Sequence, residues 1–260
     1  MFFKIGLFVV CSLFVYSDSA AYFDTLGKCK ISDSTCLKEL LQSIVTDVAK
    51  TGVKELDIPQ IDPITVYNIS MSILNIAEMT LIEGTAKGAK DCVVRKFEVD
   101  VEAERAFLEL KCDFSVKGRY HVFSNSPLLK TFVGGETLEG DGNGKVKIEK
   151  LVVKMDFDFF IKKRDGDFFI MPKSDKIKYS YDIGKMQFFA DSIYIGKQES
   201  SKLVTGLLND NWRSMMQTFG KPFMDNAMDL VFVFLKKFFD TVPAKSFISD
   251  DLSSYARDAA

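Results

Sequence analysis

Histidine and tryptophan are almost absent from this chain, which has one residue of each among 260. A catalytic triad or a zinc site would therefore depend on His121 alone. His121 follows Tyr120 in a strand-like run, and no neighbouring residue would activate it. The sequence also lacks a Cys-x-x-Cys pair and the G-x-S-x-G segment of an α/β-hydrolase. We therefore expect neither an enzyme nor a metal site, and no cofactor.

An excess of positive charge is also missing. Lys and Arg number 34 and Asp and Glu 36, which gives a net charge of −2. Nucleic-acid binding needs a basic footprint, and attraction to an anionic membrane needs basic clusters. We therefore expect no nucleic-acid partner and no stable membrane insertion.

The first 20 residues have the three parts of a signal peptide. Lys4 supplies the positive charge, Ile5–Tyr16 is apolar, and small residues follow. The alternative is a membrane anchor, but the apolar run of about 12 residues is shorter than the roughly 20 that a spanning helix needs. Cleavage is expected after Ala20, or alternatively after Ser19 or Ala21. We expect the chain to be secreted and extracellular.

Four cysteines follow the signal, and an even number in an exported chain favours disulfides. Cys29 and Cys36 are the local pair. Cys92 and Cys112 flank a predicted hairpin with its turn near Glu102–Arg105, which would place them nearly opposite on adjacent strands. The alternative for this second pair is two free thiols in a core rich in phenylalanine, of which the chain has 24.

Apolar residues repeat at helical spacing just after the first cysteine pair. They are Leu37, Leu40, Leu41, Ile44, Val45 and Val48. Asp33 or Ser34 can cap the start of this helix, and Gly52 suits the position just beyond its end.

The middle of the chain, about 64–195, alternates apolar and polar residues as antiparallel strands do. The predicted strands are Tyr67–Ile73, Cys92–Val101, Ala106–Val116, Lys145–Phe160, Phe168–Met171 and Lys176–Phe189. The glycines of 140–145 match neither a phosphate-binding nor a calcium-binding loop, so we predict a turn or bulge there. Asn68-Ile69-Ser70 is a glycosylation sequon, and the alternation places Asn68 on the polar face.

A long apolar helix is predicted over 210–240, about 45 Å in length. Asn209-Asp210-Asn211 could cap its start, and Pro222 should kink it. Its C-terminal half is apolar on nearly every side, so other elements must wrap it.

Several segments together resemble the insect juvenile-hormone-binding and takeout family. Gly118–Val122 is similar to the family's G-x-Y strand, Gly140 and Gly142 to its G-x-G, and Leu207–Met215 to its L-N-e-N-W helix start. Pro243 and Phe247 echo the helix exit. The family's phrase around D-P after the cysteine pair is matched by Gly52, Glu55, Leu56, Ile58, Pro59, Ile61, Asp62 and Pro63.

This resemblance implies an α+β fold of the tubular lipid-binding type. A strongly curved antiparallel sheet would roll around the long C-terminal helix and enclose an apolar tunnel, with the short N-terminal helix beside it. The expected domains are a signal peptide over 1–20, one lipid-binding domain over 21–248 and a polar tail over 249–260.

The resemblance further implies a carrier of juvenile hormone, another terpenoid or a fatty-acid-like ligand in haemolymph or chemosensory fluid. We expect a monomer, and a cell-surface receptor is a further partner to consider. The alternative is a secreted signalling or interaction protein, linked to circadian or feeding behaviour, whose tunnel is filled by phenylalanine. The predicted ligand-binding residues are Leu40, Ile44, Val48, Trp212, Met215, Met216, Phe219 and Phe223.

Overall fold

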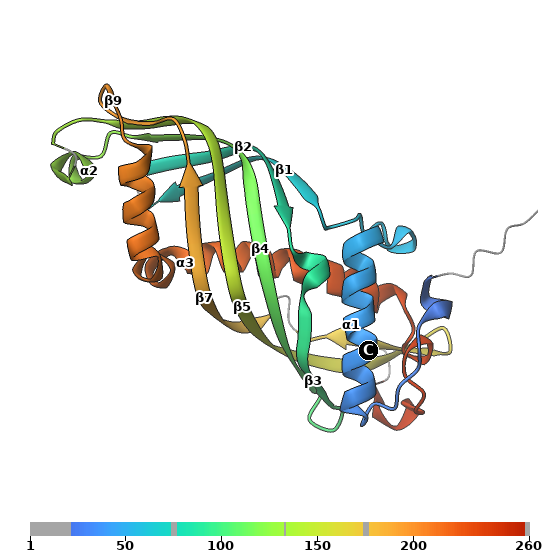
Figure 1. Cartoon of the computed structure of the whole chain (residues 1–260). Helices are drawn as coiled ribbons and strands as arrows, with labels where there is room; N and C mark the ends of the chain where they lie inside the picture. The colour runs from blue at the N-terminus through green and yellow to red at the C-terminus, as the bar shows by residue number, and fades with distance from the viewer. Residues whose placement is uncertain (1–21, 74–76, 133, 174–176, 258–260) are drawn as a thin grey trace, which may run out of the picture.

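The computed structural model describes residues 22–73, 77–132, 134–173 and 177–257. The predicted signal peptide lies outside these residues. One large, curved antiparallel sheet dominates the fold, and a long C-terminal helix crosses behind it (Figure 1). The predicted α+β architecture is confirmed.

The strands are β1 (Ile64–Ile73), β2 (Ala77–Lys87), β3 (Val93–Asp100), β4 (Arg105–Ser124), β5 (Leu138–Arg164), β6 (Asp167–Pro172), β7 (Lys178–Ala190), β8 (Ile193–Ile195), β9 (Gln198–Glu199) and β10 (Ala256–Arg257). The α-helices are α1 (Ser34–Thr51), α2 (Pro127–Phe132) and α3 (Ser201–Thr241). Short 3₁₀ turns are η1 (Tyr22–Thr25), η2 (Lys54–Leu56), η3 (Ala89–Asp91), η4 (Ala244–Ser246) and η5 (Ser253–Tyr255).

The 27-residue strand β5 is the centre of the sheet. It pairs with β4 along most of its length, and at different levels with β6, β7 and β8, all antiparallel, and with β10 in parallel. The path of the sheet runs β1-β2-β4-β5-β8-β9, and β3 continues the β2 side by pairing with the first half of β4. Both β3 and β7 therefore lie at edges.

A bulge at the middle of β4 and β5 bends the sheet. The pairing register shifts between Cys112 and Phe114, and Lys150 on β5 has a φ of 56°. The carboxylate of Asp113 accepts a hydrogen bond from the Lys150 backbone N–H. The bulge therefore does not leave the N–H of Lys150 without a partner. Bulges of this kind increase local bending and twist.

Helix α1 forms as the sequence predicts. The Asp33 side chain accepts a hydrogen bond from the Cys36 N–H at 3.0 Å, and Gly52 ends the helix at a φ of 69°. A Cβ at Gly52 would collide with the backbone around Ile58, so glycine is required there on two counts.

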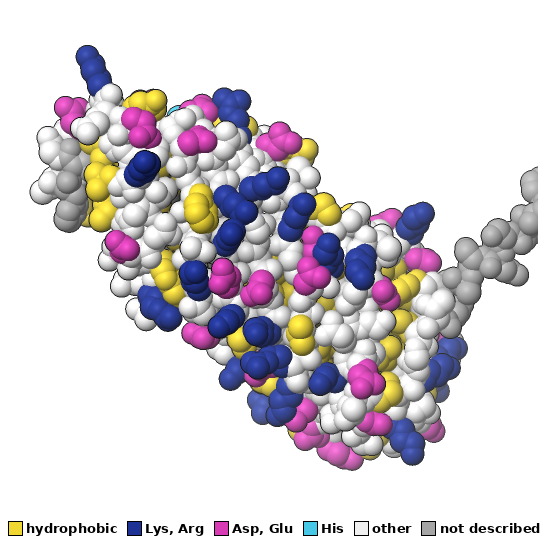
Figure 2. Space-filling view, viewed as in Figure 1, with side chains coloured by type: hydrophobic (Ala, Val, Ile, Leu, Met, Phe, Trp, Pro, Cys, Tyr) yellow, Lys and Arg dark blue, Asp and Glu magenta, His cyan; other side chains and the backbone are white. Residues whose placement is uncertain are grey.

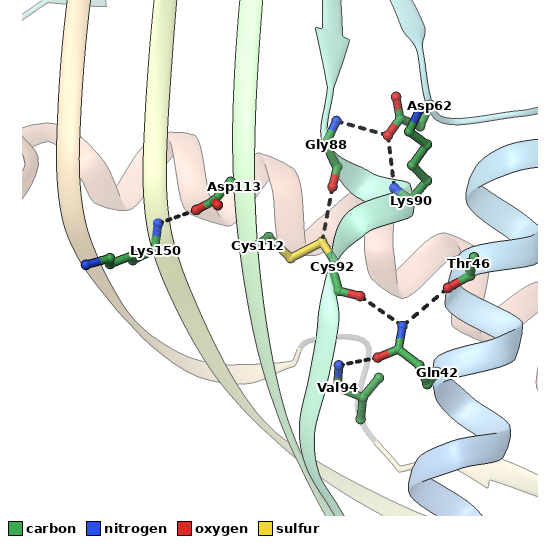
Figure 3. The surroundings of a disulfide bond; sticks show 10 residues. All are labelled: Gln42, Thr46, Asp62, Gly88, Lys90, Cys92, Val94, Cys112, Asp113 and Lys150. Atoms are coloured by element: carbon green, nitrogen blue, oxygen red, sulfur yellow. Dashed lines mark hydrogen bonds between the residues drawn. A yellow bond between two sulfur atoms is a disulfide. The ribbon is translucent and has the colours of Figure 1, made fainter.

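Both predicted disulfides are present, and Figure 3 shows the one between Cys92 and Cys112. Cys29 pairs with Cys36 and Cys92 with Cys112, with Cα atoms 5.6 and 4.3 Å apart. Cys92 immediately precedes β3, and the register of β3 on β4 brings it opposite Cys112. The hairpin argument from sequence therefore gives the right pairing.

The segment after α1 carries one buried acid, Asp62, whose carboxylate is satisfied by backbone hydrogen bonds. Its side-chain carboxylate accepts hydrogen bonds from the backbone N–H groups of Gly88 and Lys90 at 3.0 and 2.9 Å (Figure 3). Its own N–H donates to Ala49 in α1. Asp62 is only 3% exposed, and it ties α1 to the turn that leads into Cys92.

The predicted turn or bulge at 140–145 is wrong, because these glycines lie inside β5 and pair with β4 in unbroken register. They leave space on the inner face of the strand. The Tyr120 side chain lies beside Gly140 and Gly144, where a Cβ would come within 3.2 Å of its hydroxyl and its ring, respectively. Asp191 occupies the space beside Gly142. Small residues here therefore allow close packing instead of a reversal of the chain.

The predicted cap at 209–211 is also wrong, since α3 begins earlier, at Ser201 with Ser200 as its cap residue. The helix packs on the sheet as expected, but it is not enclosed on every side: Leu230 and Val233 are 46% and 48% exposed. Strand β2 and helix α2 were not predicted individually.

The packing around these glycines can be tested through the buried hydroxyl of Tyr120. It donates to the Asp191 carbonyl at 2.7 Å, and burial raises its pKa to about 12. The raised pKa means that the folded state favours the neutral phenol. The stability that the neutral Tyr120 contributes is therefore fully present below pH 10 and is lost as pH rises toward 12.

We expect Tyr120→Phe to lower the free energy of unfolding by about 1 kcal/mol at pH 7 and to reduce the loss of stability between pH 7 and pH 11. Urea unfolding at both pH values measures this. Tyr67→Phe is the control, because Tyr67 is 61% exposed. Equal alkaline losses in Tyr120→Phe and the wild-type chain would contradict the assignment.

Candidate functional site

An apolar cluster joins α3, α1 and the inner face of the sheet, and we name it the central cluster. Its buried members are Val94, Leu108, Leu151, Val153, Met155, Ile177, Ile183, Met224 and Met228. Strand alternation produces this face, because even-numbered residues of β4 and odd-numbered residues of β5 beyond the bulge point the same way.

Many large side chains that pack on the central cluster remain only half-buried. They include Leu110, Phe114, Ile148, Met186, Trp212 and Met216. These residues come from β4, β5, β7 and the first half of α3, so the exposed apolar surface is shared by helix and sheet. A face of this kind can bury an apolar molecule without displacing the core beneath it.

Methionine is concentrated in this cluster. Five of the ten methionines belong to it or pack on it: Met155, Met186, Met216, Met224 and Met228. The unbranched, polarisable methionine side chain adapts to irregular shapes at low cost. The cluster can therefore change its contour to suit different apolar ligands.

Helix α3 turns sharply near its middle, as Figure 1 shows. Pro222 lies at this level and cannot donate a helical hydrogen bond. Two tyrosines of β7 hold the turn: Tyr181 donates to the Met216 carbonyl at 3.2 Å, and Tyr179 donates to the Asp225 carboxylate at 2.6 Å. The predicted kink is confirmed.

Gly220 allows this contact between helix and strand. It is buried, and a Cβ there would collide with the Tyr181 hydroxyl. Burial and the neighbouring Asp225 carboxylate both raise the pKa of Tyr179 above its ordinary value. Tyr179 thus remains a neutral donor at physiological pH.

Two carboxamide side chains attach the helices to opposite edges of the sheet. Asn209 of α3 accepts from the Phe188 N–H at 2.7 Å and donates to the Phe188 carbonyl at 3.0 Å, on the free edge of β7. Gln42 of α1 accepts from the Val94 N–H at 2.7 Å and donates to the Cys92 carbonyl at 2.9 Å, at the edge of β3 (Figure 3). Each amide supplies the donor and acceptor that a neighbouring strand would provide.

The structure brings together only some of the ligand-binding residues predicted from sequence. Trp212 and Met216 pack on the central cluster, and in α1 their companions are Leu41 and Val45. Leu40 packs instead on the cluster around the first disulfide, and Val48 on the cluster formed by Val53, Leu56 and Ile58.

Ile44 and Met215 are half-buried, and Phe223 is 44% exposed. The side chain of Phe219 lies outside the described part of the structure. Contact of any of the eight residues with a ligand remains a prediction.

Two hollows lie near the start of the described chain, away from the central cluster. The larger has a volume of about 310 Å³ between α1 and the segment before it, with Leu26, Leu40 and Asp47 in its wall. The smaller, about 210 Å³, is lined by Phe23, Leu26, Lys28, Lys245 and Ser246. Neither is lined by residues of α3 or of the sheet.

Phenylalanine fills the interior where α3 ends. The Phe238 ring lies 6.2 Å from that of Phe23, 5.3 Å from Phe239 and 5.7 Å from Phe247, measured between centroids. Phe234 packs nearby with Val48. Aromatic rings therefore pack together at this end of α3, whereas Trp212 and Met216 pack on the central cluster.

The described residues contain no group of three metal-ligating side chains. Within the same residues, no helix has the length and apolar character needed to cross a bilayer. His121 lies exposed on β4, and Asn68 of the predicted sequon is exposed on β1; its glycosylation remains a prediction.

Comparison with known proteins identifies the family of this chain and solved structures that share its fold. The model of the haemolymph juvenile hormone binding protein family matches residues 6–249. The crystal structure of Takeout 1 from Epiphyas postvittana superposes with a TM-score of 0.72 at 23% identity, covering 86% of this chain and 99% of that one.

A lipopolysaccharide binding protein gives a TM-score of only 0.39 at 9% identity, covering 82% of this chain and 39% of that one. No match is found among the curated proteins.

Asn209 provides the clearest test of how α3 is held over the site. We expect Asn209→Ala to lower the free energy of unfolding by about 1–3 kcal/mol, because the Phe188 N–H and carbonyl would lose their partner. Amide exchange at Phe188 should accelerate as well, as followed by NMR.

Asn211→Ala is the matched control. Asn211 lies on the same helix, but its side chain donates only to the Leu207 carbonyl one turn earlier. If the two variants lose equal stability and leave exchange at Phe188 unchanged, Asn209 does not attach α3 to the sheet.

Proposed function

Because the chain belongs to the haemolymph juvenile hormone binding protein family, we propose that it is a secreted carrier of a small hydrophobic ligand. The ligand would lie between α3 and the inner face of the sheet, against the central cluster. The supporting observation is the set of half-buried apolar side chains that this face presents, chief among them Trp212 and Met216.

The driving force would be removal of apolar surface from water. Burial of about 300 Å² at ~25 cal/mol per Å² corresponds to roughly 7 kcal/mol before the costs of association. Micromolar affinity then requires a site that needs little rearrangement. The attachments at Gln42 and Asn209 favour such preorganisation, because they fix both helices relative to the sheet.

The polar groups around the site favour an oily ligand. Gln42 and Asn209 are hydrogen-bonded to strand edges, and the Tyr181 hydroxyl is bonded to the helix backbone. Apolar contact would therefore supply most of the affinity. Juvenile hormone, another terpenoid or a fatty-acid-like molecule fits this description, and methionine would allow more than one of them.

A second function is favoured by the packing at the end of α3. Phe23, Phe238, Phe239 and Phe247 fill that end, and neither described hollow is lined by α3. A secreted signalling or interaction protein with a filled interior would have these features. Ligand uptake distinguishes the two functions.

We expect the purified chain, after extraction of lipid, to bind the fluorescent probe N-phenyl-1-naphthylamine and to release it to a terpenoid or fatty acid. Met216→Trp should weaken binding about tenfold, because the larger ring occupies the space beside Trp212. Fluorescence titration gives the affinities, and thermal unfolding checks that the variant is folded.

Gln217→Trp is the control, because Gln217 is the next residue of α3 and is exposed. It should bind as the wild-type chain does. A folded, delipidated chain that takes up no probe would overturn the carrier function and favour the signalling protein.

A further inference from the structure

Four lysines form a compact block on the outer face of the sheet, opposite α3. They are Lys87 of β2, Lys117 of β4, and Lys145 and Lys147 of β5. The inner face of β4 carries the buried Tyr120 and Val122, so residues such as Lys117 point outward. Figure 2 shows Lys and Arg side chains gathered over the middle of this face.

The pairing register makes the block continuous. One row across the strands is Lys87, Ser115, Lys147 and Gln187, and the next is Thr85, Lys117, Lys145 and Phe189. Adjacent strands are about 5 Å apart, so Lys117 and Lys145 are direct neighbours with the same charge. Neither row contains an acidic residue.

None of the four lysines forms an ion pair within the described residues, although other basic residues on this face do. Arg119, the next outward residue of β4, pairs with Asp141 at 3.1 Å. Like charges directly opposite on adjacent strands destabilise a sheet. The pair of Lys117 and Lys145 therefore carries a stability cost.

Acidic residues border the block on both sides along the strands. Glu83 and Asp141 lie beyond one row, and Asp113 and Glu149 beyond the other. A broad anionic surface such as a membrane would also meet these carboxylates, so it would gain less from the lysines than a narrow ligand would. A narrow anionic chain lying across β2, β4 and β5 would meet only the lysines.

The exposed Phe189 ring adds apolar contact at the end of the block. It is 47% exposed, and the Lys147 ammonium lies 5.8 Å from its centroid. A peptide can use both the charges and this ring. We propose that the lysine block is a docking site for an extended acidic segment of a partner protein.

The test uses the mature chain and a labelled oligoglutamate peptide of about ten residues, measured by fluorescence anisotropy. The peptide should bind at low salt and dissociate as salt rises. Lys145→Glu should weaken binding about tenfold, since it removes one attraction and adds one repulsion. The same variant should unfold at the same or a higher temperature, because the new carboxylate would face the Lys117 ammonium across the strands and replace a like-charge pair.

Lys38→Glu is the control, because Lys38 is exposed on α1 and the change in net charge is identical. It should leave peptide binding within about twofold of the wild-type value. The proposal is overturned if both variants lose equal affinity, or if the wild-type chain does not bind the peptide. It is also overturned if Lys145→Glu selectively abolishes binding to phosphatidylserine vesicles or a heparin oligosaccharide and leaves the peptide unaffected.

Discussion

The attachment of two helices to two sheet edges through carboxamide side chains is the constraint on which the structure depends. Asn209 satisfies the backbone of Phe188 on β7, and Gln42 satisfies Cys92 and Val94 beside β3. Free strand edges are otherwise available for unwanted pairing. Here the same bonds cover the edges and set the position of α1 and α3, so the apolar inner face lies between helices of fixed location.

Curvature of the sheet is the second requirement, and it is concentrated at one level. The bulge at Asp113 and Lys150, the Cys92–Cys112 disulfide and the Asp62 carboxylate all lie close together (Figure 3). The disulfide joins β4 to the start of β3, and Asp62 joins the same start to the end of α1. The bend in the sheet is thereby coupled to the position of α1, the helix that carries Gln42.

Local signals in the sequence were sufficient for much of this architecture. The helical spacing from Leu37 to Val48 with Gly52 at its end gave α1, and the hairpin between Cys92 and Cys112 gave the second disulfide. The glycines of 140–145 misled the prediction, because their role is to make room for Tyr120, a contact between distant segments. Only the tertiary structure shows such a contact.

The site was less predictable than the fold. Helical spacing places Trp212 and Met216 on an apolar stripe, and both pack on the central cluster. In α1 the residues that pack there are Leu41 and Val45, whereas the predicted ligand contacts are their neighbours Leu40 and Ile44. The apolar side of α1 faces more than one cluster, since Leu40 packs around the first disulfide and Leu41 and Val45 pack on the central cluster, and only the tertiary structure shows this division. Asn209 was interpreted as a cap, since its actual partner lies on β7, 21 residues earlier.

The central claim is that the face bearing Trp212 and Met216 receives an apolar ligand. A crystal of the delipidated chain soaked with a brominated fatty acid, analysed by anomalous scattering, locates the ligand directly. The account predicts bromine density against the central cluster, between α3 and the inner face of the sheet. Density confined to the hollow beside Leu26 and Leu40, or no bound bromine at saturating ligand, would contradict it.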